Sequence, residues 1–210
     1  MSIIIPLLKI MKMKKPKSKI PLFKVFMAPT AKKKVGEVLD SGFIGQGSKV
    51  DEFEVNLKKY FNNDYTLTTN AGTSALHLAL HLLKEPDENQ ASFQGVAFWD
   101  QKWPGLKEGD EVLATPMTCT ASNWPILANG LKIKWVDIDP KTLNMDLDDL
   151  ARKISPTTKA IMLVHWGGYP NDLRKIKKIQ EKAGRLYGFK PAVIEDGAHS
   201  YERCLCYCRY

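Results

Sequence analysis

Short apolar runs alternate with helical segments along the second half of the chain, and this alternation constrains the fold more than any other feature. Four strands fit the pattern, at 110–115, 132–138, 159–166 and 192–196. Three helices fit it as well, at 120–130, 146–154 and 171–184. Strands joined by helices form parallel sheets, because the chain must cross one face before it can pair again. The sequence therefore predicts an α/β protein with three α/β/α layers and a mostly parallel sheet.

The first half of the chain is predicted to be mainly helical. Helices are expected at 28–42, 48–61 and 70–84, with a short strand at 65–69. Residues 85–108 are rich in polar and aromatic residues without a period, which indicates a long irregular insertion. The expected domain organisation is a basic extension at 1–22, which we expect to be disordered, followed by one incomplete domain at 23–210.

The positive charge of the chain is confined to one end. The net charge is +8, yet ten lysines and no acidic residue fall within residues 1–34, so the rest of the chain is slightly acidic. A basic groove for nucleic acid is therefore not expected in the folded part. Met11 or Met13 could be the true start of translation.

The cysteines and the hydropathy define the expected environment. Cys119 stands alone, and three more cysteines occur together in the terminal stretch "CLCYC", a spacing that suits neither a disulfide framework nor a zinc site. We therefore expect no metal and a reduced, cytoplasmic setting. No apolar run is long enough to cross a bilayer, so no membrane partner is expected.

A turn rich in glycine and hydroxyl residues opens the helix predicted at 70–84. Gly72, Thr73 and Ser74 would present backbone N–H groups, hydroxyls and the positive end of the helix dipole, which together bind phosphate. Simple helix capping is the alternative for these residue types. A dinucleotide-binding oxidoreductase is disfavoured, because no G-x-G-x-x-G run follows a strand.

Further candidates follow the predicted strands, where ligands bind in open α/β sheets. Residues 118–120 follow the first strand, and Cys119 among them could lie against a planar ligand or be a small buried apolar residue. His165 ends the third strand, where a structural role is the more common one. Asp196 and His199 follow the last strand. A carboxylate there can pair with a protonated pyridine nitrogen or remain a solvated acid in a turn.

A phosphate cradle, a ring-facing segment and a strand-end aspartate, in that order, are what pyridoxal 5′-phosphate requires. At these places the chain resembles the DegT–DnrJ–StrS family of sugar aminotransferases, which use this cofactor on the aspartate-aminotransferase fold. The matching stretches include "SGFIGQGSKVDEFE", "NAGTSALHLAL", "GDEVLATPMTCTASNWPILANG", "TTKAIMLVHWGGYPNDL" and "VIEDGAHSYE". They occur in the order of the family and cover most of residues 36–202.

The resemblance implies roles for individual residues. The turn at Gly72, Thr73 and Ser74 would hold the phosphate, and Asp196 would pair with the pyridine nitrogen. His199 would lie near the ring hydroxyl, and Cys119 would replace the aromatic residue that stacks on the ring in many members. The turn formed by Phe43, Ile44 and Gly45 would help to form the substrate entrance.

The same resemblance implies the activity and the partners. The expected reaction is transfer of an amino group, with glutamate as a donor, to a nucleotide-linked keto-sugar in amino-sugar or polysaccharide biosynthesis. A homodimer is expected for the full-length enzyme.

The chain departs from the family pattern after Glu202. The family places its Schiff-base lysine downstream of this point, no lysine of the chain matches it, and the small C-terminal domain is missing. We therefore expect no catalytic residue within the chain. The tail "RCLCYCRY" differs in character from what precedes it, which indicates a shifted reading frame near residue 203. The alternative function is accordingly a truncated, non-catalytic fragment of such an enzyme.

Overall fold

The computed structural model describes residues 25–84 and 103–200. The chain divides into two compact units, Met1–Asp51 and Glu52–Tyr210, and each is considered by itself. The predicted basic extension, most of the predicted insertion and the cysteine-rich tail lie outside the described residues.

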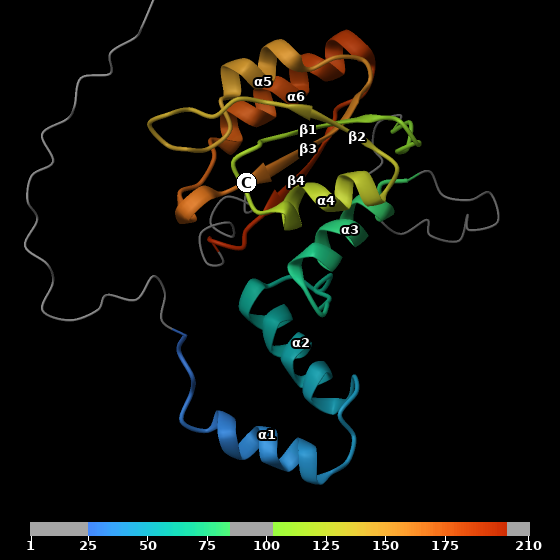
Figure 1. Cartoon of the computed structure of the whole chain (residues 1–210). Coiled ribbons are helices and arrows are strands. Elements are labelled where there is room, and N and C mark those ends of the chain that lie inside the picture. The colour runs from blue at the N-terminus through green and yellow to red at the C-terminus, as the bar shows by residue number, and fades with distance from the viewer. Residues whose placement is uncertain (1–24, 85–102, 201–210) are drawn as a thin grey trace, which may run out of the picture. The chain divides into compact units, whose positions relative to one another are not determined.

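A parallel sheet forms the centre of the second unit (Figure 1). Its strands are β1 (Glu111–Ala114), β2 (Lys132–Trp135), β3 (Thr158–Val164) and β4 (Ala192–Asp196), in the order β2-β1-β3-β4. All three strand pairs are parallel, as the alternation of strands and helices predicts. In the register of β3 with β4, Val164 lies opposite Asp196, so these two strands end together.

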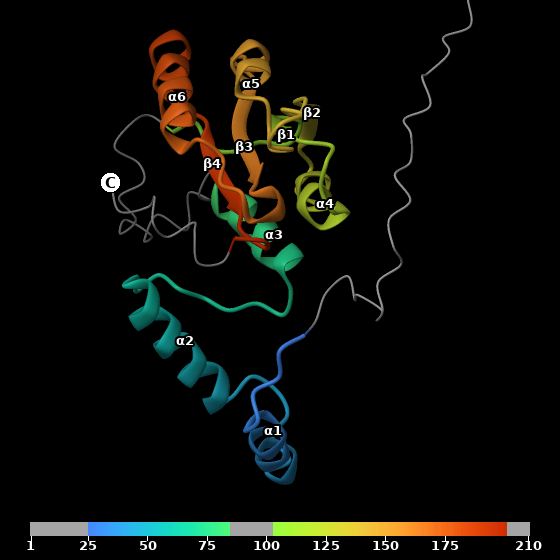
Figure 2. The same cartoon turned by 90° about the vertical axis from the view of Figure 1, so that its left-hand side faces the viewer.

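Helices cover both faces of the sheet (Figures 1 and 2). One face is covered by α3 (Gly72–Leu82) and α4 (Thr120–Ala128), and the other by α5 (Leu147–Lys153) and α6 (Leu173–Tyr187). The short 3-10 helix η2 (Trp166–Gly168) follows β3 directly. The three-layer α/β/α prediction is confirmed.

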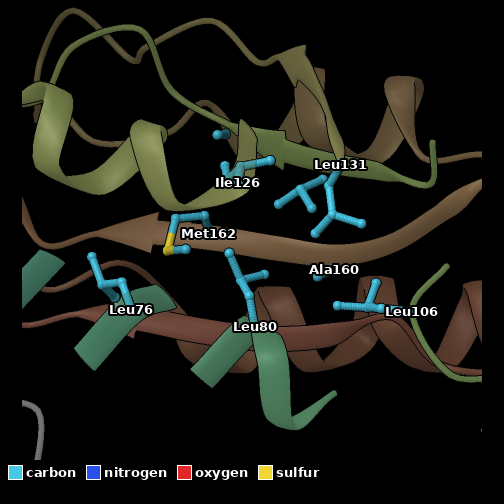
Figure 3. Close-up of a cluster of buried hydrophobic side chains, with 9 residues drawn as sticks. Leu76, Leu80, Leu106, Ile126, Leu131, Ala160 and Met162 are labelled. Carbon is cyan, nitrogen blue, oxygen red and sulfur yellow. The ribbon is translucent and has the colours of Figure 1, made fainter. Parts of the chain in front are cut away.

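Alternation along the strands separates the core into two clusters, because successive side chains of a strand point to opposite faces. On β3, Ala160 and Met162 join the cluster beneath α3 and α4, whereas Ile161 and Leu163 join the cluster beneath α5 and α6. Figure 3 shows the first cluster, with Leu76 and Leu80 contributed by α3 and Ile126 by α4. The central strand is therefore buried on both faces, as its continuous apolar run predicts.

The first unit contains α1 (Ala31–Asp40) and the start of α2 (Ser48–Phe61). Both helices were expected from their apolar spacing. No residue of either helix is buried.

Two local predictions are wrong. Residues 65–69 form no strand, and Glu54 instead accepts hydrogen bonds from the backbone N–H and hydroxyl of Thr68 at 2.8 and 2.7 Å. The last helix does not stop at Gly184, because Gly188 supplies the left-handed residue that ends it, with φ +81°.

The helix predicted at 146–154 is α5, and it begins after the N-cap residue Asp146. The Asp146 carboxylate caps the helix by accepting from the N–H groups of Asp148 and Asp149. Asp149 does not complete a capping box with Asp146. Its carboxylate instead accepts the N–H of Asp137 at 2.8 Å and pairs with Lys153 at 2.7 Å, so it joins α5 to the segment after β2.

Candidate functional site

Asp196 is the last residue of β4, and its carboxylate is bonded on both oxygens. Oδ1 accepts the backbone N–H of Ala198 at 3.0 Å, and Oδ2 accepts the hydroxyl of Ser122 at 2.7 Å. Asp196 is half-buried. A carboxylate has about four acceptor positions, so these two bonds orient the group and leave capacity for a donor from a ligand.

Two hydroxyl groups of the β1–α4 connection lead to this carboxylate. Ser122, in the first turn of α4, is 1% exposed, and its Oγ lies 2.8 Å from Oγ1 of Thr118. A serine hydroxyl has one proton, and an ionised Asp196 can only accept. Ser122 must therefore donate to Asp196 and accept from Thr118, which orders the two hydroxyl protons toward the carboxylate.

Sequence reasoning missed Ser122. The sequence pattern indicates only residues 118–120 of the stretch that contains it. The spacing of the hydroxyl residues could have indicated Ser122, because it follows Thr118 by four residues at the start of a helix.

His165 follows β3 and is almost fully buried, with 1% of its surface exposed. Its Nδ1 accepts the backbone N–H of Asn171 at 3.1 Å, so the ring proton is on Nε2 and is donated to Glu195 Oε2 at 2.9 Å. The backbone N–H of His165 also donates to the carbonyl of Asp196 at 3.2 Å. His165 thus ties β3 to the end of β4, which is the structural role that its residue type predicts.

His199 lies three residues beyond Asp196 and is exposed. Its Nδ1 accepts the backbone N–H of Gly167 at 3.2 Å. Trp166 packs edge-on against the imidazole, with 5.4 Å between ring centroids and 68° between planes. Asp196 and His199 therefore belong to one turn at the carboxyl edge of the sheet, as predicted.

The amino end of α3 has no side-chain cap. The N-cap position is occupied by Ala71, which makes no side-chain hydrogen bond, so the capping alternative for Thr73 and Ser74 does not hold. A Cβ built on Gly72 would meet no atom within 4 Å, so this position is open. The backbone N–H groups of the first turn of α3, at the positive end of the helix dipole, thus receive no side-chain cap from the N-cap residue.

Packing brings α3 to the same strand that carries Asp196. Leu76, one turn after Gly72, belongs to the cluster against which Ile194 of β4 packs. Figure 3 shows the place of Leu76 beside Met162. The predicted phosphate cradle is therefore on the helix that covers this part of the sheet, although it makes no hydrogen bond with Asp196.

Cys119 is exposed, which excludes the buried apolar role. It is the N-cap residue of α4 and has no side-chain capping bond. Its carbonyl accepts the N–H of Ser122 at 3.0 Å, so the backbone of Cys119 is one hydrogen bond away from the residue that holds Asp196. This places Cys119 at the same edge as the carboxylate.

The predicted substrate residues lie in the other compact unit. Phe43 and Ile44 are 64% and 74% exposed, and Gly45 has open space around it. Their part in a substrate entrance stays a prediction.

The described residues contain neither a cluster of metal-binding side chains nor a membrane-spanning helix. No group of three or more His, Cys, Asp or Glu side chains among residues 25–84 and 103–200 could hold a metal ion. No described helix is long and apolar enough to cross a membrane.

Comparison with known proteins supplies independent evidence. The sequence profile of the DegT/DnrJ/EryC1/StrS aminotransferase family matches residues 27–203. A curated GDP-4-keto-6-deoxy-D-mannose 3-dehydratase from Yersinia pseudotuberculosis is 31% identical over 166 residues, which are 79% of this chain and 37% of the relative. GDP-perosamine synthase from Escherichia coli O157:H7 is 33% identical over 183 residues, covering 87% of this chain and 43% of the relative.

Proteins of known structure are similar to this chain in both sequence and fold. AtS13 from Actinomadura melliaura is 50% identical with a TM-score of 0.73, covering 87% of this chain and 44% of that one. The sugar aminotransferase CalS13 from Micromonospora echinospora is 43% identical with a TM-score of 0.73, covering 88% and 44%. The chain therefore spans less than half the length of these relatives.

Proposed function

The chain belongs to the DegT/DnrJ/EryC1/StrS aminotransferase family, and we propose that it binds pyridoxal 5′-phosphate and serves amino transfer to a nucleotide-linked keto-sugar. The observation that carries this proposal is the Asp196 carboxylate. This carboxylate lies at the end of a strand, where it accepts hydrogen bonds from Ser122 and Ala198 and can still accept another from a ligand.

The residues present fit the cofactor at both of its charged ends. The uncapped first turn of α3 suits a phosphate group, because Gly72 leaves open space and its N–H groups need acceptors. Asp196 suits a protonated pyridine nitrogen, since an oriented carboxylate keeps that nitrogen charged. Two related proteins of known structure contain this cofactor, an Escherichia coli GDP-4-keto-6-deoxy-D-mannose-3-dehydratase and a Streptococcus pneumoniae sugar aminotransferase.

Each residue has a separate task in the proposed site. Gly72, Thr73 and Ser74 bind the phosphate, Asp196 holds the pyridine nitrogen, and His199 faces the ring hydroxyl. Cys119 lies against the ring, where a thiol offers less contact area than an aromatic side chain. When bound, pyridoxal phosphate supplies the electron sink that amino transfer requires.

The partners proposed for the whole protein follow the relatives. The substrate is a nucleotide-linked keto-sugar, glutamate is the amino donor, and the enzyme acts as a homodimer. GDP-perosamine synthase and a dTDP-sugar 4-aminotransferase from Saccharopolyspora spinosa support the substrate class. A cytoplasmic location is also proposed, because the spacing of the four cysteines does not suit a disulfide framework.

Dehydration is the second candidate function. Curated relatives from Yersinia pseudotuberculosis and Escherichia coli O55:H7, each 31% identical, are GDP-4-keto-6-deoxy-D-mannose 3-dehydratases. Such an enzyme removes water at carbon 3 of the sugar, whereas amino transfer replaces the keto oxygen with an amine. Mass spectrometry of the sugar nucleotide after incubation with glutamate distinguishes the two products.

Cofactor binding is tested with pyridoxamine 5′-phosphate, because the aldehyde form would react with surface lysines. We expect saturable binding by calorimetry, and we expect Asp196→Asn to weaken it far more than His199→Asn. Leaving a charge without its buried ionic partner costs roughly 3–5 kcal/mol, against about 0.5–1.5 for a neutral hydrogen bond. Equal dissociation constants for the two variants would contradict the assignment of Asp196.

A further inference from the structure

The turn Trp166–Gly168 lies against His199, although 32 residues separate Gly167 from the histidine. Its position follows from the sheet, since β3 and β4 end in register at Val164 and Asp196. The turn after β3 therefore meets the turn after β4.

The backbone of this turn determines which nitrogen of His199 carries the proton. The N–H of Gly167 donates to Nδ1 at 3.2 Å, so Nδ1 must have a free lone pair. In a neutral imidazole the other nitrogen then carries the hydrogen. Nε2–H of this exposed ring has no hydrogen-bond partner within the described residues, and it is available to a ligand.

Glycine is required in the turn for two reasons. Gly167 and Gly168 have φ values of +59° and +79°, which side chains with a Cβ rarely adopt. A Cβ on Gly168 would also lie 2.7 Å from the carbonyl oxygen of His199, which is closer than real contacts allow. The second glycine thus permits the close approach of the two turns.

The turn is anchored to buried structure on its other side. The backbone N–H of Trp166 donates to Oδ1 of Asn144 at 2.9 Å, and Nδ2 of Asn144 donates to the carbonyl of Tyr169 at 2.9 Å. Asn144 is buried. One side chain therefore holds both ends of the turn, and the Gly167 N–H has a defined direction.

We propose that the Trp166–Gly168 turn is a positioning element, which holds His199 so that its Nε2–H points to an acceptor oxygen of the ligand bound at Asp196. The proposal rests on the proposed function, in which that oxygen is the ring hydroxyl of the cofactor. Gly167 and Gly168 act through His199 and do not themselves touch the cofactor.

The first measurement uses the ligand-free chain labelled with ¹⁵N. At pH 9, where histidine side chains are neutral, we expect a scalar coupling across the hydrogen bond between the Gly167 amide nitrogen and His199 Nδ1. The spectrum of His199→Ala assigns the signal. Absence of the coupling in the folded wild-type chain overturns the proposal, and this result does not depend on any cofactor.

The second measurement compares two glycine substitutions. Gly168→Ala brings both the left-handed backbone cost and the clash with His199, whereas Gly188→Ala has a similar φ of +81° and no atom within 4 Å. We expect Gly168→Ala to abolish the coupling and to weaken pyridoxamine phosphate binding roughly 3- to 10-fold, the value of one hydrogen bond. Gly188→Ala should retain both.

A double-mutant cycle separates positioning from general destabilisation. If the turn acts through His199, Gly168→Ala together with His199→Ala binds no more weakly than His199→Ala alone. Additive losses would overturn the proposal, as would an intact coupling in Gly168→Ala. Failure of the wild-type chain to bind pyridoxamine phosphate while the coupling persists would instead contradict the proposed function. If Gly168→Ala does not fold, the presence or absence of the coupling in the wild-type chain still tests the proposal.

Discussion

At the scale of single residues, the site depends on hydrogen bonds that fix protons in place. Ser122 donates a hydrogen bond to Asp196, and His165 and His199 each accept a hydrogen bond from a backbone N–H on Nδ1. The buried ring of His165 donates its Nε2–H to Glu195, whereas Nε2 of the exposed His199 ring has no hydrogen-bond partner among the described residues. Two histidines with the same hydrogen bond on Nδ1 therefore differ in burial and in what their other nitrogen contacts.

Ser122→Ala tests the hydroxyl chain. The variant removes the donor to Oδ2 of Asp196 and the acceptor of Thr118, so we expect unfolding free energy to fall by about 1–3 kcal/mol. Binding of pyridoxamine phosphate should also weaken, because the carboxylate loses its orientation. Thr118→Val should have a smaller effect on binding, since Thr118 reaches Asp196 only through Ser122.

For Ser122→Ala, urea unfolding measures the unfolding free energy and calorimetry measures the binding of pyridoxamine phosphate. Thr120→Ala, at an exposed position in the same turn of α4, is the control and should stay within about 0.5 kcal/mol of wild type. A Ser122→Ala variant as stable as the control would mean that the hydroxyl chain contributes nothing.

At the scale of elements, Asp149 links α5 to the segment after β2. The N–H of Asp137, followed by the ion pair with Lys153, lowers the pKa of this carboxyl below its usual range. A lowered folded pKa means that the unfolded chain binds more protons, so this part of the stability is present above about pH 4. It is lost as the pH falls through the lower folded pKa.

Asp149→Asn should therefore destabilise the protein at pH 7 by about 1–3 kcal/mol, because the ion pair with Lys153 is lost. The difference from wild type should begin to shrink below about pH 4, the usual pKa of an aspartate, and should disappear as the pH falls through the lower pKa of the folded carboxyl. Urea unfolding at several pH values measures this. Asp148, which is exposed and pairs with Lys175, provides the control Asp148→Asn. A pH-independent difference would show that the charge of Asp149 is not the cause.

At the scale of the whole second unit, one cluster joins two helices to the sheet. Leu80 is fully buried in it, whereas Leu82 on the same helix is 66% exposed. Leu80→Ala should cost about 2–5 kcal/mol of unfolding free energy because it leaves a cavity. Leu82→Ala should cost less than about 0.5 kcal/mol. Similar losses in urea unfolding would mean that α3 does not pack on the sheet as described.

The sequence alone was enough to predict the periodic elements. The apolar runs that became β1 and β3 predict parallel strands, which are buried, and β4 also forms where predicted although its five residues are only half-buried. The helix predicted at 146–154 is α5, which Asp146 caps. These features depend on residues that are close in sequence, and the spacing of the apolar residues indicates which positions are buried. The stretch 65–69 has strand-like residues but no partner strand, so propensity alone misled the prediction there.

The place of three candidate residues was predictable from the sequence, but Ser122 and the contacts of the site were not. Asp196, His199 and Cys119 all lie at the predicted edge, since parallel strands end on the same side of a sheet. Ser122 and Gly167 reach this edge across 74 and 32 residues of sequence. Only the register of the strands and the packing of α4 bring their donors within hydrogen-bond distance, and no local pattern encodes such a distance.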